Sequence, residues 1–538
     1  LYSWIKEDHP ELYSSVQRAI HRGQWLPVGG MWVEADCNLT GAESLVRQFL
    51  LGRTFFRREF GAGSDSPVLW LPDVFGYAAN LPQLMKQAGL RYFFSIKLGW
   101  NQYNRIPYDM FWWEGIDGTK VLTHFSTTKQ PESAMVSTYN SDASPGQIMS
   151  TWTNFQQKDI GQSGSPPPLL MSYGYGDGGG GPTREMLENI NILSEFPGAP
   201  RLKFSKAIDF YKELEQDVGE FLPTWQGELY LEYHRGTYTT QSRIKRANRK
   251  TEVLLHDAEF LCTAAAWSLD NFQYPKEELR RAWECHCLNQ FHDILPGSSI
   301  GPVYEKALNQ YEALTKDLIA VRNDALDALS ENLGSPGASI VVNPSPFEQK
   351  LPVLIPVTDH SDSVLPYLVA LEHQPVEEGI LVDAGVLPPY SITRLSNLDV
   401  RSSEGASADY FSVSANHLEN EYLKISFNED GDIVSIFDKT QVRELVPHGE
   451  LANEFQLFED RPLAPDAWDI DKFYDDRMWT AEPASSINVV ESGPLRAAVE
   501  IRRKALSSDL KQKISLYRSS PLISFETEVN WHEKRTLL

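Results

Sequence analysis

Two segments of this chain place a carboxylate directly after an apolar run. The first, residues 71–77, reads Leu-Pro-Asp-Val-Phe-Gly-Tyr and combines Asp73 with the rings of Phe75 and Tyr77. In α/β folds, chemistry gathers in the loops that follow the carboxyl ends of strands. A carboxylate between aromatic rings suits a sugar site, because rings offer an apolar face while oxygens accept hydroxyl groups. The local pattern equally allows Asp73 to cap the helix predicted to begin near Leu81.

The second segment, residues 173–183, is a glycine-rich loop around Asp177. Gly174, Gly176 and Gly179 satisfy the spacing G-x-G-x-x-G of dinucleotide-binding loops, which is a weak signal by itself. Asp177 would repel a pyrophosphate, and no acidic residue ends a second strand about 20 residues further on. We therefore favour a loop that brings Asp177 close to a substrate, and we keep a dinucleotide-binding enzyme that uses the Gly174–Gly181 loop as an alternative.

A third candidate lies in residues 289–297, where His292 and Asp293 stand at a helix end before a turn. His292 could be a metal ligand, and Asp293 could bind substrate, but a histidine in this position is often purely structural. Cys285-His286-Cys287 superficially suggests a zinc motif. Because no second cysteine pair lies nearby, its spacing fails that of structural zinc sites, and we interpret it as core.

Taken together and in order, these segments resemble glycoside hydrolase family 38, the class II α-mannosidases, and most of all its neutral, cytosolic or vacuolar subgroup. The resemblance also extends to later segments and covers nearly the whole chain. The segments that carry it are residues 25–34, 70–77, 174–181, 227–240, 289–293, 466–469 and 529–533.

The resemblance implies a retaining exo-α-mannosidase that releases terminal α-linked mannose from oligosaccharides and free N-glycans. It implies that Asp73 is the nucleophile and a metal ligand, and that Asp177 is the general acid/base. It implies that His292 is another metal ligand, and that substrate contacts come from Phe75, Lys97 and Asp293. A chain that has lost activity and only binds mannose is a further alternative.

The resemblance also implies one zinc ion, with cobalt an alternative because the two metals share ligands and geometry. The family carries a His-x-Asp pair on its first barrel strand, and residues 1–215 contain no such pair. The one match, His360-Ser361-Asp362, lies in the β region and out of order, so we interpret it as a chance surface turn. We expect two further ligands upstream of Leu1, a chain truncated at both ends, and therefore weak zinc binding and weak activity.

The elements that must position these residues change character along the chain. Residues 1–215 alternate helical and strand-like patterns, which predicts an α/β catalytic domain with a largely parallel sheet. The family resemblance implies that this domain is an incomplete (β/α)7-type barrel that lacks its first strand. The pattern predicts a helix over 43–56, a second from 183 to about 196, and strands at 68–71, 92–96, 121–123 and 169–173.

Residues 222–332 predict a helical middle domain, with apolar residues at three- and four-residue steps typical of a bundle. From residue 339 onward, alternation and turn signals predict antiparallel β-sandwich domains. We expect a small β domain over 338–415 and the start of a truncated large β-sandwich domain over 416–538. The predicted helices are 253–269, 276–292 and 301–333, and the predicted strands are 340–342, 351–355, 422–427, 514–517 and 523–529.

Composition excludes several function classes. Among 538 residues, 41% are hydrophobic and 23% charged, which is ordinary for a folded protein, and the net charge of −24 disfavours nucleic acids and anionic membranes as partners. No run approaches the roughly 18 apolar residues of a membrane span. Four cysteines are too few for a disulfide scaffold, so we expect reduced thiols and a cytoplasmic protein, with a vacuole or lysosome-like compartment as an alternative. Homo-oligomerisation stays open.

Overall fold

The computed structural model describes the whole chain except residues 131–135, 161–165, 178, 334–339, 357–370, 395–409 and 464–466. The segment His360-Ser361-Asp362, interpreted above as a chance turn, lies outside the described residues. The chain divides into two compact units. Unit 1 comprises Leu1–Leu255, Lys276–Ile319 and Ala464–Asp469, and unit 2 comprises His256–Pro275, Ala320–Leu463 and Ile470–Leu538.

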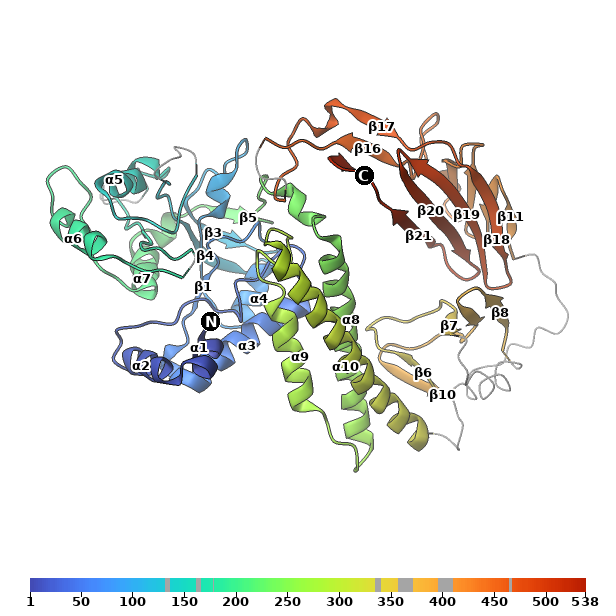
Figure 1. Cartoon of the computed structure of the whole chain (residues 1–538), viewed down its shortest axis with the longest axis horizontal. Helices are drawn as coiled ribbons and strands as arrows, with labels where there is room; N and C mark the ends of the chain where they lie inside the picture. Colours follow the sequence, from blue (N-terminus) through green and yellow to red (C-terminus); the bar gives the residue numbers. More distant parts are fainter. Residues whose placement is uncertain are drawn as a thin grey trace. The chain divides into compact units, whose positions relative to one another are not determined.

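Unit 1 is built around a five-stranded sheet with the order β1-β2-β4-β3-β5 (Figure 1). β1, β2 and β4 run parallel, β3 is antiparallel to β4, and β5 is parallel to β3. The prediction of an α/β region with a largely parallel sheet is therefore confirmed. The strands are β1 (Val68–Trp70), β2 (Tyr92–Ser95), β3 (Met110–Glu114), β4 (Lys120–Phe125) and β5 (Thr224–Gln226).

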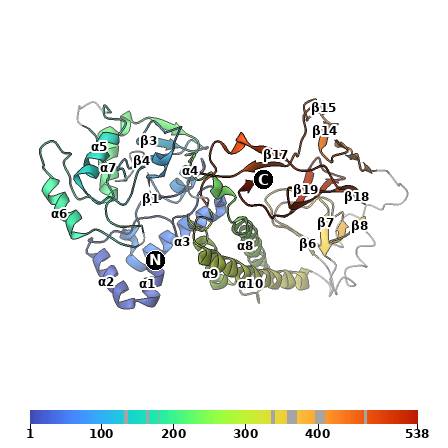
Figure 2. The same ribbon diagram turned by 45° about the horizontal axis from the view of Figure 1, so that its top comes forward.

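Helix α7 packs against this sheet, since its Phe210 and Leu214 share a buried cluster with Phe94 of β2 and Met110 of β3. Figure 2 shows α5 and α7 beside the strands β3 and β4. The apolar positions of α3 that predicted a helix over 43–56, such as Leu45 and Phe49, are buried in the core of unit 1. The helices of this part are α1 (Tyr2–Asp8), α2 (Pro10–His21), α3 (Ala42–Phe60), α4 (Leu81–Gln87), α5 (Pro145–Asn154), α6 (Arg184–Leu193) and α7 (Ala207–Val218).

Helix α3 lies unusually close to the segment that carries Glu34. The Trp32 amide donates to the Gln48 carbonyl at 2.8 Å, and the Val33 amide donates to the Gln48 side chain at 3.1 Å. Gly52 makes this approach feasible, because a Cβ there would lie 2.3 Å from the Met31 carbonyl carbon. The helix thereby holds in place a segment that enters the site described below.

Two predictions in this region are corrected. Residues 169–173 form no strand, because three prolines precede them and the Leu170 amide donates instead to Nε2 of His124 at 3.3 Å. Only Tyr173 makes a bridge, to Ser141. Conversely, β3 was not predicted, although Asp117-Gly118 lies in the turn between β3 and β4 and is a recognised hairpin signal.

Three long helices follow, and the predicted limits of the last, 301–333, agree with the structure. In unit 2, Leu261 and Ala265 of α8 share a buried cluster with Ala325 and Leu329 of α10. In unit 1, α9 packs against α3, and Cys287 and His286 are fully buried there, as expected for core. The helices are α8 (Ser242–Ser268), α9 (Lys276–Leu288) and α10 (Gly301–Leu333).

The β region of unit 2 consists of antiparallel sheets, as predicted. Its largest buried cluster joins residues of β12–β14, including Ile425 and Ile433, with residues of β19 and β20, including Val499 and Ile514. The strands are β6 (Ile340–Asn343), β7 (Val353–Pro356), β8 (His373–Val376), β9 (Gly379–Val382), β10 (Ser391–Arg394), β11 (Ser412–Ser414), β12 (His417–Glu419), β13 (Leu423–Phe427), β14 (Ile433–Asp438), β15 (Arg443–Glu444), β16 (Gln456–Glu459), β17 (Met478–Thr480), β18 (Ser486–Ser492), β19 (Arg496–Ala505), β20 (Ser508–Tyr517), β21 (Ile523–Asn530) and β22 (Thr536–Leu537).

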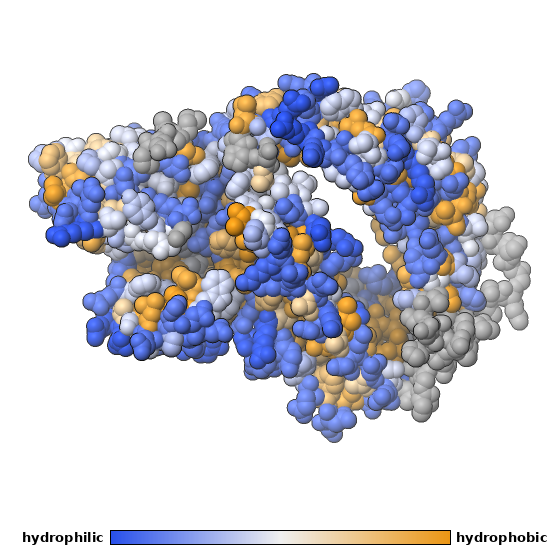
Figure 3. All heavy atoms as spheres, viewed as in Figure 1, coloured by the Kyte–Doolittle hydropathy of each residue, from blue (hydrophilic) through white to orange (hydrophobic). Residues whose placement is uncertain are grey.

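Hydrophilic residues cover most of the face seen in Figure 3. All four cysteines are free thiols, and three of them are buried. None of the helices in the described part of the chain combines the length and the apolarity that a bilayer crossing requires.

Candidate active site

Asp73 lies three residues beyond β1, in a turn fixed from several sides. The Leu71 amide donates to the Phe94 carbonyl at 3.1 Å, and the Ile96 amide donates to the Pro72 carbonyl at 3.2 Å. The Tyr77 hydroxyl lies 2.7 Å from both the Leu71 carbonyl and the Ser95 hydroxyl. The turn is therefore anchored at the carboxyl ends of the parallel strands β1 and β2, which is the edge where α/β sheets carry their sites.

The Asp73 carboxylate receives a donor on each oxygen. Lys97 Nζ lies 2.5 Å from Oδ1, and the Tyr139 hydroxyl donates to Oδ2 at 3.2 Å. Lys97 is buried, and its ammonium stands over the rings of Trp100 and Phe75, 4.0 and 4.9 Å from their centroids. An ammonium in this position fixes the orientation of the carboxylate through a short, charge-assisted hydrogen bond.

His292 lies close to Asp73 although the two residues are far apart in the sequence. Its backbone amide and its ring Nδ1 both lie within hydrogen-bond distance of the Glu34 carbonyl, at 3.0 and 3.1 Å. The ring Nε2 then lies 4.0 Å from Asp73 Oδ2 and 3.9 Å from Asp293 Oδ2. Asp293 is held in turn by the Ser298 hydroxyl, which donates to its Oδ1 at 2.6 Å. Phe75 is buried, with its ring centroid 6.1 Å from that of His292.

Glu34 adds a further carboxylate to this group. Its Oε2 lies 3.7 Å from His292 Nδ1. Burial raises the pKa of Glu34 to about 7; His292 opposes this shift, while the charges of Asp73 and Asp177 add to it. Glu34 is therefore within electrostatic reach of two other acidic side chains, which come from different parts of unit 1.

Asp177 is linked to Asp73 through two consecutive residues. Tyr139 donates to the Asp73 carboxylate, and the side-chain oxygen of Asn140 accepts the amides of Gly176 and Asp177 at 3.1 and 3.2 Å. The charges of Asp73 and Asp177 both raise the pKa of Tyr139, after the larger effect of burial. The Asp177 residue itself is exposed.

The glycine loop around Asp177 is poorly suited to a pyrophosphate. Its amides are already used, because Gly174 donates to the Ser141 carbonyl, Tyr175 to Gly181, and Gly176 and Asp177 to Asn140. A phosphate-binding loop needs such amides free to face the ligand. The dinucleotide alternative therefore gains no support from the described residues of this loop.

Several residues of the site carry no recognisable signal in the sequence. Tyr139 and Asn140 follow no recognisable strand or turn signal, so local sequence offers no sign of them. Glu34 lies in a segment used for the family resemblance, but no role was attached to it. The positions Asp73, Phe75, Lys97, His292 and Asp293, by contrast, are brought together.

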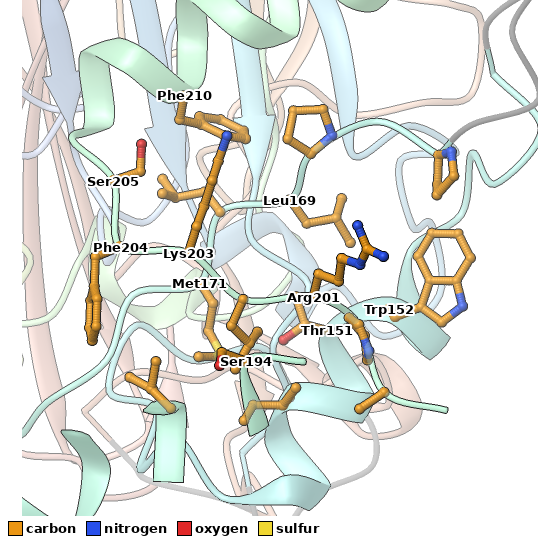
Figure 4. A pocket seen from close by; sticks show the side chains of 18 of the residues that line it. Thr151, Trp152, Leu169, Met171, Ser194, Arg201, Lys203, Phe204, Ser205 and Phe210 are labelled. Carbon is orange, nitrogen blue, oxygen red and sulfur yellow. The ribbon is translucent and has the colours of Figure 1, made fainter. Parts of the chain in front are cut away.

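A large pocket of about 1180 Å³ lies elsewhere in unit 1 (Figure 4). Its walls come from α5, the end of α6, α7 and the residues around Leu169, and the Arg201 side chain points across it towards Trp152. Tyr173 is the lining residue nearest in sequence to Asp177, and no predicted site residue lines the pocket. Among the described residues, the lining of this pocket lacks the convergent carboxylates and histidine that mark the Asp73 site as the candidate for chemistry.

The residues present do not make a complete zinc site. Asp73 and His292 face each other, but zinc in proteins usually takes four ligands, or three and a substrate or water. Among the described residues there is no group of three or more His, Cys, Asp or Glu side chains arranged to hold a metal.

Comparison with known families matches three parts of the chain. The descriptions are Glycosyl hydrolases family 38 N-terminal domain for residues 1–228, Alpha mannosidase middle domain for residues 232–329, and Glycosyl hydrolases family 38 C-terminal domain for residues 418–538.

Curated relatives match over nearly the whole chain. Human Alpha-mannosidase 2C1 is 35% identical, covering 99% of this chain and 49% of that protein. The Alpha-mannosidase of Saccharomyces cerevisiae is 33% identical, covering 93% of this chain and 42% of that protein. The chain thus spans about half the length of these relatives.

The fold has a counterpart among solved structures. The crystal structure of an alpha-mannosidase from Enterococcus faecalis V583 superimposes with a TM-score of 0.73 at 18% identity, covering 98% of this chain and 68% of that one. Together with the ordered family matches, this places the chain: it belongs to glycoside hydrolase family 38.

Proposed function

We propose that this protein is a retaining exo-α-mannosidase that removes terminal α-linked mannose from oligosaccharides, including free N-glycans. The observation that carries the proposal is the Asp73 carboxylate, held by Lys97 and Tyr139 at the end of β1 and faced by His292. The names of the relatives support the substrate class. On the same resemblance we propose that the α/β region belongs to a (β/α)7-type barrel, followed by a helical bundle and β-sandwich domains.

In the first step, an Asp73 oxygen attacks the anomeric carbon of the terminal mannose, and the bond to the leaving oxygen breaks. Asp177 donates a proton to that oxygen, and a mannosyl-enzyme forms on Asp73. Lys97 and Tyr139 fix the direction of attack, since each donor holds one carboxylate oxygen while other lone pairs stay available.

In the second step, Asp177 takes a proton from water, which attacks the same carbon and displaces Asp73. Two inversions give net retention of the anomeric configuration. Phe75 offers an apolar face to the sugar ring, and Asp293, held by Ser298, accepts from its hydroxyl groups.

For the metal we propose that Asp73 and His292 contribute two ligands to a zinc or cobalt ion, and that the described residues leave the set incomplete. We therefore expect the isolated chain to keep well under one zinc per molecule after dialysis against a metal-free buffer. Elemental analysis measures this directly. Tight, stoichiometric zinc that the His292→Gln variant loses would show that the set is complete.

We propose a cytoplasmic location from the four free thiols, because reducing compartments keep cysteines unpaired; a vacuole or lysosome-like compartment is the alternative. A mannose-containing oligosaccharide is the proposed partner, and oligomeric state stays open. The competing proposal, a chain that binds mannose without cleaving it, predicts sugar binding with no turnover.

The test of the activity is release of a phenol from aryl α-mannosides. We expect Asp177→Asn to lower kcat/KM by roughly 10²-fold or more for a poor leaving group, and far less for an activated one that needs no proton. The exposed Asp270 offers a control, because Asp270→Asn should leave both substrates unaffected. Equal losses for both leaving groups would contradict the acid role, and no turnover with retained sugar binding would favour the binding protein.

A further inference from the structure

His234 is held in a backbone conformation that histidine seldom adopts. Its φ is +63° and its ψ is 32°, in the left-handed region, although the residue is 6% exposed. Such a conformation is unfavourable for residues other than glycine and persists only where surrounding structure imposes it. At this position the surrounding structure comes from more than 230 residues further along the chain.

The residues that impose it are Trp468 and Asp469, which belong to unit 1 despite their place in the sequence. The His234 amide donates to Asp469 Oδ1 at 2.6 Å, and the Gly236 amide donates to the Trp468 carbonyl at 2.8 Å. Gly236 allows this approach, since a Cβ there would lie 3.0 Å from the Trp468 oxygen. The backbone around His234 is therefore built to accept this segment.

The ring of His234 borders the Asp73 site. Its centroid lies 4.9 Å from that of Phe75 in an edge-on arrangement and 5.8 Å from that of Trp100. These are the two rings over which the Lys97 ammonium stands. Burial lowers the pKa of His234, the Asp469 carboxylate opposes this shift, and among the smaller effects Lys97 lowers the pKa while Asp73 raises it.

Asp469 also faces the ring itself. His234 Nδ1 lies 3.5 Å from Asp469 Oδ2, and both atoms are buried without a hydrogen-bond partner. A small movement makes Nδ1–H donate to this carboxylate, which leaves Nε2 as the acceptor. Nε2 is not among the buried unpartnered atoms, and no described residue hydrogen-bonds to it, so it is open to a ligand.

We propose that His234 is a substrate-binding residue whose Nε2 accepts a hydrogen bond from one hydroxyl of the mannose ring, and that Asp469 is the positioning residue that fixes its tautomer and orientation. This inference rests on the proposed function. It explains why a strained, buried histidine and a carboxylate remote in sequence meet beside Phe75, where a packed core would need neither polar group.

The test uses His234→Asn, because asparagine tolerates the left-handed conformation but is too short to replace Nε2. We expect kcat/KM for an aryl α-mannoside to fall by about 10- to 100-fold, with a thermal unfolding temperature close to wild type. Asp469→Asn should also lower kcat/KM, but by less, because the side-chain oxygen of asparagine still accepts a hydrogen bond from the His234 backbone amide. Asp475→Asn, at an exposed aspartate about six residues further along the chain, is the matched control.

Substrates that lack one hydroxyl identify the contact. With wild type, every monodeoxy mannoside should have a lower kcat/KM than the parent mannoside. With His234→Asn, the monodeoxy mannoside that lacks the contacted hydroxyl should have the same kcat/KM as the parent mannoside. A variant with unchanged kcat/KM, or with the same further loss for every deoxy substrate, would overturn the inference. If wild type turns over no α-mannoside at all, the proposed function fails as well, so the two failures are distinguishable.

Discussion

The sheet of β18–β21 and the Asp73 site are assembled in opposite ways. In the sheet, ten consecutive pairs join β19 to β20, from Arg496↔Tyr517 to Ala505↔Ser508, and the connecting turn is two residues long. In the site, Asp73 meets Lys97 from 24 residues away and His292 from 219, and His292 meets Glu34 from 258. Local pattern therefore determines the sheet, whereas the site exists only after distant segments have packed.

This difference also separates how the two regions use charge. In the β region, Arg496 pairs with Glu491 and Arg503 with Asp432, so opposite charges neutralise each other locally. In the site, burial raises the pKa of Glu34, and the charges of Asp73 and Asp177 add to this shift, an arrangement typical of sites that perform chemistry. Like charges are thus gathered in the site, whereas the β region pairs opposite charges.

The largest expected effect comes from Gly52→Ala in α3. The new Cβ would lie 2.3 Å from the Met31 carbonyl carbon, so helix and segment must separate, and we expect a loss of about 3 kcal/mol or more. Hydrogen exchange should then accelerate in β1 and α3 but not in β19 and β20. Gly146→Ala in α5 is the control, because no atom lies within 4 Å there and a slight stabilisation is expected. Similar effects of Gly52→Ala and Gly146→Ala would contradict a close approach of α3 to the segment around Met31.

A second effect concerns the ion pair of Asp73. Lys97→Met removes the ammonium that holds the carboxylate, and we expect kcat/KM for an aryl α-mannoside to fall by roughly 10²-fold. The matched change in the β region is Lys504→Met, which breaks the exposed pair with Asp509 at 3.1 Å. That variant should change the free energy of unfolding by less than about 1 kcal/mol and leave activity intact. Equal kinetics for Lys97→Met and wild type would contradict the role of Lys97.

Protonation should also affect the sheet of unit 1 and the β region in different pH ranges. Burial lowers the pKa of His124 in β4 to about 4, from an ordinary value of 6.5. Because the folded state holds fewer protons, the contribution of neutral His124 is complete above pH 6.5 and is lost as pH falls towards 4. Relative to His124→Gln, wild type should lose about 2 kcal/mol of stability between pH 7 and 5, measured by denaturant unfolding at each pH. A difference that is constant with pH would refute this.

The smallest effect is expected at Glu378 of the β region. Its pKa is lowered to about 2, first by the hydrogen bond from Lys513 and in part by Arg496. This contribution is complete above pH 4.5 and is lost only as pH falls towards 2, well below the range of His124. The hydrogen-exchange rates of β19 and β20 should differ between wild type and Glu378→Gln near neutral pH. The two sets of rates should become equal only as the pH falls towards 2. Exchange rates that become equal already between pH 7 and 5 would contradict the separate pH ranges expected for Glu378 and His124.

The sequence predicts the fold well where a repeated pattern has one interpretation. Apolar residues at helical spacing define 301–333 to the residue, and alternation identifies β13, β20 and β21. It fails where a contact outside the segment decides the outcome. Residues 169–173 look like a strand, yet Leu170 donates to a histidine ring instead of to a neighbouring strand.

The same reasoning explains the site. Residue types and spacing selected Asp73, Phe75, His292 and Asp293, and the family resemblance added Lys97 and the role of each residue. The structure brings these five residues together. Tyr139 was missed because nothing in its neighbourhood marks it, and its importance lies wholly in a contact across 66 residues with Asp73. His234 and Asp469 stood in segments that carried the resemblance, but their pairing across 235 residues is visible only in the folded chain.

The central claim, that Asp73 is the nucleophile of a retaining mannosidase, is tested most directly by trapping the mannosyl-enzyme. A fluorinated mannosyl fluoride slows the second step, so even a weakly active protein accumulates the adduct. Mass analysis of proteolytic peptides should find one mannosyl group on the peptide that contains Asp73, and none in Asp73→Asn. An adduct on another carboxylate, or measurable turnover of aryl α-mannosides with no adduct on Asp73, would contradict the account.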